Sequence, residues 1–162
     1  MTTRIVDEQD HDTPVVRRRR ITAENDATMR TVIEVDGTGT LVTDEPESSG
    51  GTNAGPTPLT TVLAALCGCE SVTFHRTAGE LGLAYEGISF VADFTIDIRG
   101  RNGDRAVRPH FQTVRLEAAV TTEATAEELA AVVEETEARC PVFNLLSDAG
   151  VRIETVWVRR GA

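Results

Sequence analysis

Two cysteines are the residues most able to carry chemistry. Cys69 lies inside a long apolar segment, and Cys140 opens the sequence Cys140-Pro141-Val142-Phe143. Each occupies a position where a helix is expected to pack. If the two helices meet, the thiols form a pair that can cycle with a disulfide, and a thiolate in such a pair can attack an electrophilic oxygen or sulfur. The alternative for Cys69 is a small buried hydrophobe, since free cysteine is among the most buried residue types.

A third cysteine, Cys67, is two residues from Cys69. Positions i and i+2 of a helix point to different sides, so Cys67 is interpreted as core packing, with a resolving role as the alternative. No metal is expected. Cys67, Cys69, His75 and Cys140 offer suitable ligand types, but Cys-x-Cys within a helix lacks the chelating geometry of Cys-x-x-Cys.

The composition restricts the classes of partner. The chain has 162 residues, 40% of them hydrophobic, and a formal net charge of −10, which opposes binding to nucleic acid and to anionic membranes. All basic residues are arginine, so Schiff-base chemistry and a phosphate-binding loop ending in lysine are excluded. No apolar run is long enough to span a membrane, and the polar start resembles no signal peptide. We therefore expect a cytoplasmic protein without a cofactor.

Residues 1–12 are expected to form a flexible tail, and residues 13–162 a single domain. Short β-branched runs at 31–35 and 40–42 flank Asp36-Gly37, which is a strong hairpin signal. Residues 44–56 have the composition of a loop, long enough to suggest a functional role. Thr57-Pro58 then opens a helix that continues to about Gly79 and is apolar on more than one face.

Alternating apolar residues predict strands at 88–99 and 111–120, with a bend at 99–104. Thr125 followed by Glu127 and Glu128 has the pattern of a capped helix that runs to about Arg139. Pro141 breaks it, a short helix is expected at 142–148, and a last strand at 151–158. This order of elements favours an α+β fold over a doubly wound sheet.

The combination of these motifs resembles the OsmC/Ohr family of thiol-dependent organic hydroperoxide reductases. The residues that carry the resemblance are the loop that starts at Asp44-Glu45-Pro46 and ends at Gly55-Pro56-Thr57-Pro58, Cys69 eleven residues after Pro58, and Cys140-Pro141-Val142 after the later helix. The likeness extends over residues 31–158.

The resemblance implies an OsmC-like fold in which antiparallel sheets wrap around a long buried central helix, and an intertwined homodimer. It also implies a redox-active, antioxidant peroxidase of the oxidative stress response. Cys69 matches the peroxidatic cysteine and Cys140 the resolving one, so a Cys69–Cys140 disulfide would be reduced by an external dithiol. The expected partners are thus a second copy, a hydroperoxide and a dithiol, with no nucleic acid and no membrane.

The sequence departs from the best-known organic hydroperoxide reductases at one position. Those proteins place a glutamate directly after the proline that corresponds to Pro58, and here the residue is Leu59. That glutamate orients an arginine of the N-terminal half. Arg30 is our candidate for the arginine, with Arg20 second.

The peroxidatic thiol must ionise, and Cys69 is too far from the start of its helix for the helix dipole to help much. Another positive partner is therefore needed, and arginine suits the role because it stays charged when it is buried. Leu59, Leu63 and Phe143 would line an apolar funnel that favours organic hydroperoxides. The alternatives are an OsmC-fold binding module, or a redox sensor with little peroxidase turnover.

Overall fold

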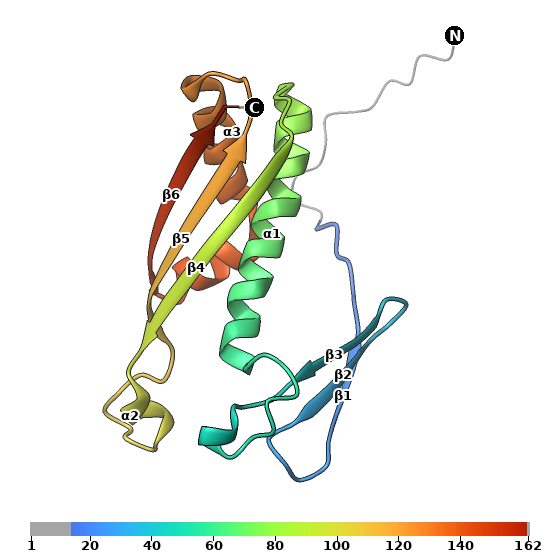
Figure 1. Cartoon of the computed structure of the whole chain (residues 1–162), viewed down its shortest axis with the longest axis vertical. Coiled ribbons are helices and arrows are strands. Elements are labelled where there is room, and N and C mark those ends of the chain that lie inside the picture. The colour runs from blue at the N-terminus through green and yellow to red at the C-terminus, as the bar shows by residue number, and fades with distance from the viewer. Residues whose placement is uncertain (1–13, 162) are drawn as a thin grey trace. The chain divides into compact units, whose positions relative to one another are not determined.

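The computed structural model describes residues 14–161, so the predicted tail at 1–12 lies outside the described residues. The chain divides into two compact units, Met1–Thr57 and Pro58–Ala162. Each unit has its own three-stranded sheet (Figure 1). A single domain over residues 13–162 remains a prediction.

The first unit contains an antiparallel meander. It is built from β1 (Ile21–Asn25), β2 (Thr31–Val35) and β3 (Gly39–Thr43), in that order across the sheet. The hairpin predicted from Asp36-Gly37 is confirmed, because β2 and β3 pair in register from Thr31↔Thr43 to Val35↔Gly39. Gly37 has a φ of 77°, which only glycine adopts without strain.

The loop after β3 is organised by the buried carboxylate of Asp44. One oxygen accepts a hydrogen bond from the Glu45 N–H at 2.8 Å. The other accepts from the Thr52 N–H at 2.9 Å, the Thr52 hydroxyl at 2.6 Å and the Ala54 N–H at 3.1 Å. A side chain at Gly51 would collide with the Glu45 carbonyl, so the loop requires glycine there. The segment is therefore a closed loop with its own polar core.

The second unit is a sheet with helices on one face, which confirms the α+β class (Figure 1). Its elements are, in order, α1 (Pro58–Leu81), β4 (Gly87–Ile96), α2 (Ile98–Arg101), β5 (Phe111–Thr121), α3 (Ala126–Arg139), α4 (Pro141–Asp148) and β6 (Arg152–Arg160). The expectation of wholly antiparallel sheets is wrong for this unit. β4 pairs antiparallel with β5, but β6 pairs parallel to β5, because α3 and α4 return the chain to the start of the sheet.

Helix α1 begins at Pro58, which suits the first helical turn, and ends with a glycine cap. Gly82 has a φ of 73°, and the Leu83 N–H reaches back to the Ala78 carbonyl at 2.9 Å, which is the bond of a Schellman motif. The expectation of a fully buried helix is not met within one chain. One face is buried, whereas Val62, Val72 and Leu81 are exposed.

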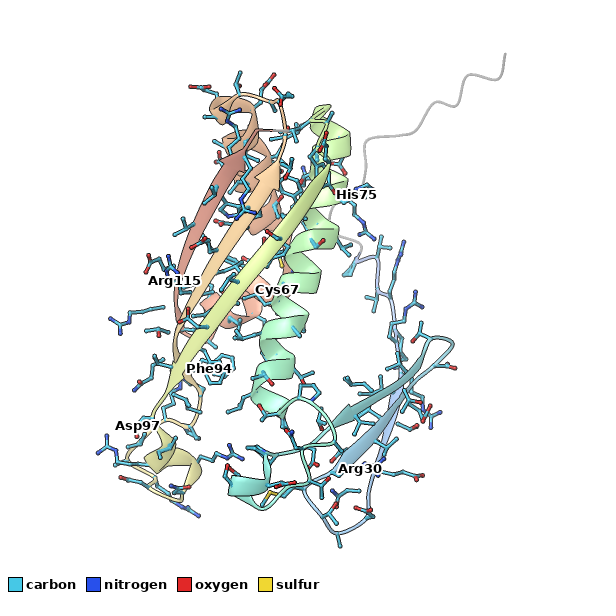
Figure 2. All side chains as sticks on the ribbon, viewed as in Figure 1. Arg30, Cys67, His75, Phe94, Asp97 and Arg115 are labelled. Atoms are coloured by element: carbon cyan, nitrogen blue, oxygen red, sulfur yellow. The ribbon has the colours of Figure 1, made fainter. Side chains whose placement is uncertain are left out.

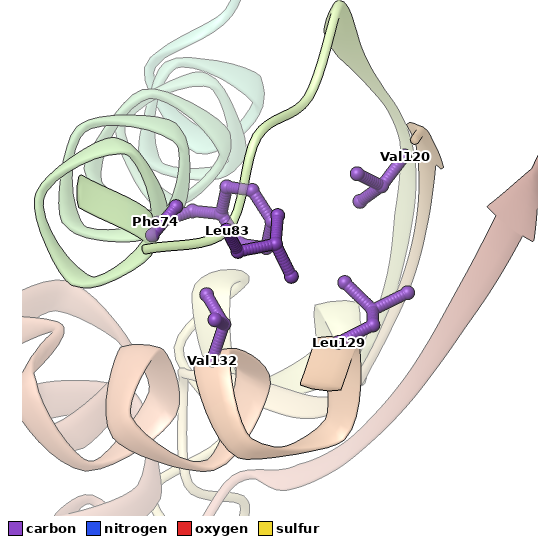
Figure 3. Close-up of a cluster of buried hydrophobic side chains, with 6 residues drawn as sticks. Phe74, Leu83, Val120, Leu129 and Val132 are labelled. Carbon is purple, nitrogen blue, oxygen red and sulfur yellow. The ribbon is translucent and has the colours of Figure 1, made fainter. Parts of the chain in front are cut away.

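Two apolar clusters join α1 to the sheet and to the later helices. In the first, Phe74 of α1 and Val132 of α3 are fully buried, together with Val120 of β5 (Figure 3). Phe74 also stacks on Trp157 of β6, with ring centroids 5.5 Å apart. The second cluster gathers Leu63, Leu66, Phe111, Val114 and Val151 around the first half of α1. The first and second halves of α1 are therefore packed in separate apolar clusters, and the middle of the helix lies between these clusters.

The predicted bend between β4 and β5 contains a short helical turn, α2, that the sequence analysis did not predict. The Asp97 side chain caps this turn by accepting a hydrogen bond from the Arg99 N–H at 3.1 Å. A further side chain at Gly100 would press on the Val107 carbonyl and Pro109. Within the described residues, no helix is long and apolar enough to cross a membrane.

Candidate dithiol site

Cys69 and Cys140 are held by different elements of the second unit. Cys69 lies near the middle of α1 and is partly buried, as its position in the apolar segment predicts. Cys140 is fully buried between α3 and α4, where it is both the last cap of one helix and the first cap of the next. Pro141 then occupies the first position of α4, so the sequence Cys-Pro creates the junction.

The backbone of Cys140 is fixed on both sides. Its N–H donates to the Thr136 carbonyl at 2.9 Å, and its carbonyl accepts from the Asn144 N–H at 3.0 Å. The Asn144 side chain also donates to this carbonyl at 2.9 Å and to the Glu137 carbonyl at 3.0 Å. These bonds fix the backbone that carries the Cys140 thiol.

The register of α1 against α3 is set by a pair of buried hydroxyls. Thr77 Oγ1 and Thr136 Oγ1 lie 2.8 Å apart. Thr77 is two helical turns beyond Glu70, and Thr136 is one turn before Cys140. The hydrogen bond therefore links α1, which carries Cys69, to the helix that precedes Cys140.

The Cys69 thiol lies near enough to the Cys140 thiol to raise its pKa, and both thiols are free. The structure thus brings together the two cysteines that the sequence singles out. Their catalytic roles remain predictions.

Burial and its neighbours keep the Cys140 thiol protonated. Its pKa is raised mainly by burial, and contacts with Cys69 and Glu70 act in the same direction. The Phe143 N–H, 3.5 Å from the Cys140 sulfur at the start of α4, acts in the opposite sense. Burial has the larger effect on the Cys140 pKa, because a single long hydrogen bond cannot replace the lost hydration of a thiolate.

Glu70 is a member of the site that the sequence analysis missed. It follows Cys69 directly, its side chain is 0% exposed, and neither carboxyl oxygen has a hydrogen-bond partner of ordinary geometry. Its interaction with the Cys140 thiol is therefore a long thiol–carboxyl contact. Burial raises the pKa of Glu70 to about 7, against the weaker lowering effect of that thiol. A signal was available, because Glu70 is the sole charged residue between Pro58 and Phe74.

Cys67 lies on α1 (Figure 2) and is half-buried, and it is not among the groups that shift the pKa of Cys140. Its pKa is raised, first by burial and then by the charge of Glu70. This placement supports a packing role. Among the described residues, no group of three or more His, Cys, Asp or Glu side chains could hold a metal ion.

The other predicted site residues fall into two groups. Leu59, Leu63 and Phe143 come together in the second apolar cluster, where Leu63 is buried and the other two are partly exposed. Arg30 belongs to the first unit, between β1 and β2 (Figure 2). Its N–H donates to Thr28 Oγ1 at 3.1 Å, and its carbonyl accepts from the Asn25 amide at 2.7 Å. Substrate contact and the role of Arg30 both remain predictions.

The fold and the paired thiols define an α+β protein with a redox-capable cysteine pair between a long helix and a helix junction. Residues 51–156 match the OsmC-like protein family. The chain belongs to this family, as the sequence motifs predict. No curated protein matches it.

Solved structures share the fold at low sequence identity. The OsmC-like protein of Mycoplasma pneumoniae has a TM-score of 0.73 and 16% identity, covering 88% of this chain and 98% of its own. An organic hydroperoxide resistance protein from Elizabethkingia anophelis gives 0.71 and 15%, covering 91% and 100%. The organic hydroperoxide resistance protein OsmC of Legionella pneumophila gives 0.69 and 18%, covering 90% and 99%.

Proposed function

We propose that the protein is a cysteine-dependent peroxidase that reduces organic hydroperoxides. The observation that carries the proposal is the proximity of the partly exposed thiol of Cys69 to the buried thiol of Cys140, whose pKa it raises. Membership of the OsmC-like family supports it, since relatives of the same fold are named organic hydroperoxide resistance proteins.

The chemistry assigned to the two thiols is balanced as follows. The Cys69 thiolate attacks the terminal oxygen of the hydroperoxide, the O–O bond breaks, and the alkoxide leaves with a proton as the alcohol. Cys69 becomes a sulfenic acid. The Cys140 thiol then attacks the Cys69 sulfur, which forms the disulfide and releases water. An external dithiol reduces this disulfide and is itself oxidised to a disulfide.

The first step requires a positive charge beside Cys69, because its position in mid-helix excludes strong help from the helix dipole. An arginine suits the role, since it stays charged when it is buried. We assign this role to Arg30. Replacement by leucine should slow sulfenate formation, whereas Arg105→Leu, on the exposed loop between α2 and β5, serves as the control.

The substrate class follows from the apolar character of Leu59, Leu63 and Phe143. Their side chains favour an alkyl or aryl group next to the peroxide over a second hydroxyl. Cumene hydroperoxide should therefore be reduced faster than hydrogen peroxide, and equal or reversed rates would remove this part of the proposal.

The protein is further proposed to act as a homodimer. Val62 and Val72 are exposed on α1, and Val91 is 66% exposed on β4. Exposed apolar side chains on adjacent elements are typical of an interface between chains. Light scattering should give twice the mass of one chain, and a monomeric mass would contradict the proposal.

Trapping of the intermediates tests the peroxidase chemistry. Treatment of the reduced protein with one equivalent of cumene hydroperoxide should produce a Cys69–Cys140 disulfide in the peptide map. In the Cys140→Ser variant, dimedone should instead trap the sulfenic acid at Cys69. Labelling at Cys67, or no oxidation at either cysteine, would exclude the assigned roles. A disulfide that forms without catalytic turnover would favour a redox sensor.

A further inference from the structure

Glu70 is a buried carboxyl that the proposed peroxidase chemistry leaves without a task. It lies on the buried face of α1 with Leu66 and Phe74, where an apolar side chain would carry no desolvation cost. Its two oxygens lack hydrogen-bond partners of ordinary geometry. Burial of a carboxyl without hydrogen-bond partners lowers the stability of the folded state, which suggests that Glu70 has a function.

The groups that face Glu70 are themselves neutral or acidic. Cys67 and Cys69 precede it on α1, and the Cys140 thiol approaches it from the helix junction. On α3 the nearest charge is Glu137, which raises the pKa of Glu70 further and whose Oε1 accepts a hydrogen bond from the Trp157 indole at 2.9 Å. The β5 side chains beneath the helices, such as Leu116 and Ala118, are apolar. Among residues 14–161, no basic group contributes to the pKa of Glu70, so the carboxyl exchanges its proton near neutrality.

Cys140 must lose its thiol proton before it can attack Cys69, so the resolving step requires a proton acceptor. A thiol that is fully buried is a poor nucleophile, because attack on Cys69 requires the thiolate and burial disfavours that charge. Water cannot take the proton directly, since Cys140 is 0% exposed. Glu70 is the ionisable acceptor in contact with the sulfur.

We propose that Glu70 is a catalytic residue that takes the proton from Cys140 when the disulfide forms and returns a proton to it when the disulfide opens. The inference rests on the proposed role of Cys69 and Cys140 as a redox pair. It concerns the resolving step and leaves the attack of Cys69 on the peroxide to other groups.

Glu70 exchanges a proton with Cys140 both when the Cys69–Cys140 disulfide forms and when it is reduced. During closure, the Glu70 carboxylate accepts the Cys140 proton, the new S–S bond forms, and the sulfenic hydroxyl leaves as water with the proton that Glu70 then releases. Before opening, the Glu70 carboxylate takes up a proton from solvent, and an external thiolate then attacks the more accessible sulfur, that of Cys69. The Cys69–Cys140 bond breaks, a mixed disulfide forms on Cys69, and the Cys140 thiolate takes the Glu70 proton, which leaves Glu70 as the carboxylate.

The test uses a disulfide probe, so that it does not depend on peroxide chemistry. Reduced protein in a Cys67→Ser background is mixed with dithiobis(nitrobenzoate). Attack by Cys69 releases the first coloured nitrothiobenzoate and leaves a mixed disulfide on Cys69. Attack by Cys140 on that mixed disulfide releases the second. The two releases are followed by stopped-flow absorbance in the parent, Glu70→Gln and Glu137→Gln, across pH.

In the parent protein, the second release should accelerate with rising pH and reach a plateau above about pH 7, as Glu70 ionises. Glu70→Gln keeps the size of the side chain but cannot take the proton. Its second release should be slower by about a hundredfold on the plateau, a typical loss for a missing general base, with no change in the first release. Glu137→Gln should keep the plateau rate and shift the midpoint to lower pH, because it removes a like charge from the surroundings of Glu70.

Equal second-release rates and pH profiles in the parent and Glu70→Gln would overturn the inference. So would a slowing of both releases in the same proportion, which indicates a distorted site. A parent that performs both releases with the predicted pH profile but consumes no hydroperoxide would refute the peroxidase and leave the role of Glu70 standing. The two proposals therefore fail separately.

Discussion

The hydroxyls of Thr77 and Thr136 lie 2.8 Å apart in the buried interface between α1 and α3, with both residues about 1% exposed or less. Each hydroxyl also lies close to a carbonyl of its own helix, 2.7 Å from Val132 for Thr136 and 3.1 Å from Phe74 for Thr77. The pair links the helix that carries Cys69 to the helix that ends at Cys140. It is therefore a buried polar contact within an otherwise apolar helix interface.

Removal of one hydroxyl of this pair should cost more than removal of both. Thr136→Val leaves the Thr77 hydroxyl with fewer partners in an apolar interface, and we expect a loss of about 1–3 kcal/mol in the free energy of unfolding. The double variant Thr77→Val/Thr136→Val should recover most of this loss. Urea unfolding of the four proteins measures the coupling, and Thr22→Val, at an exposed site on β1, is the control. Additive losses would show that the two hydroxyls do not act as a pair.

Glu70 should make stability fall as pH rises. Its pKa in the folded protein, about 7, is above the ordinary value of 4.5, so the folded state binds the proton more tightly than the unfolded state. Stability then decreases between these two pH values and becomes constant above them. Reduced Glu70→Gln should be more stable than the parent by about 2–3 kcal/mol at about pH 8, and similar to it at about pH 4.

Urea unfolding at both pH values measures the effect, with Glu134→Gln, exposed on α3, as the matched control. A difference between Glu70→Gln and the parent that does not change with pH would show that Glu70 ionises normally.

Asp44 gives the opposite pH dependence. Hydrogen bonds from the Thr52 side chain and from the N–H groups of Ala54, Glu45 and Thr52 lower its pKa to about 2. The stabilisation of the loop is therefore fully present above the ordinary value of 3.8, and is lost as pH falls towards about 2.

Asp44→Asn should remove this dependence. In the variant, the amide protons of Thr52 and Ala54 should exchange with solvent faster than in the parent near neutral pH, because the amide group accepts these hydrogen bonds more weakly than the carboxylate. Hydrogen exchange by mass spectrometry measures this, with Asp36→Asn, exposed in the β2–β3 turn, as the control. Unchanged exchange in Asp44→Asn would exclude the carboxylate as the organiser of the loop.

Local signals explain which parts of the fold could be predicted. Asp36-Gly37 predicts the β2–β3 hairpin, and Thr125 with Glu128 forms the capping box expected at the start of α3. The parallel pairing of β6 could not be predicted in this way. A period-two pattern gives the buried face of a strand, but neither its neighbour nor its direction.

Local sequence signals likewise allowed part of the candidate site to be predicted. Cys69 and Cys140 were identified by residue type and spacing, and the structure places their thiols near each other. Glu70 was missed because it occupies a position in the apolar stripe of α1, where periodicity predicts a hydrophobic residue. Its burial, and its contact with Cys140 across the interface, depend on tertiary packing.

Cys67 should be dispensable for the redox cycle. Its pKa is raised by burial, so it reacts slowly as a nucleophile, and it is not among the groups that shift the pKa of Cys140. Cys67→Ser should form the Cys69–Cys140 disulfide at the parent rate, within about twofold, with the packing change felt mainly in stability. Peptide mapping after oxidation measures this. A disulfide that includes Cys67 in the parent protein would instead assign it the resolving role.

The most direct test of the peroxidase is the consumption of cumene hydroperoxide by the parent, Cys69→Ser and Cys140→Ser, with a dithiol as the reductant. Turnover should disappear in Cys69→Ser, because the attacking sulfur is lost. In Cys140→Ser it should fall and become strongly dependent on the concentration of reductant, which must then reduce the sulfenic acid itself. No turnover in the parent with any dithiol, or full turnover in Cys69→Ser, would contradict the proposed function.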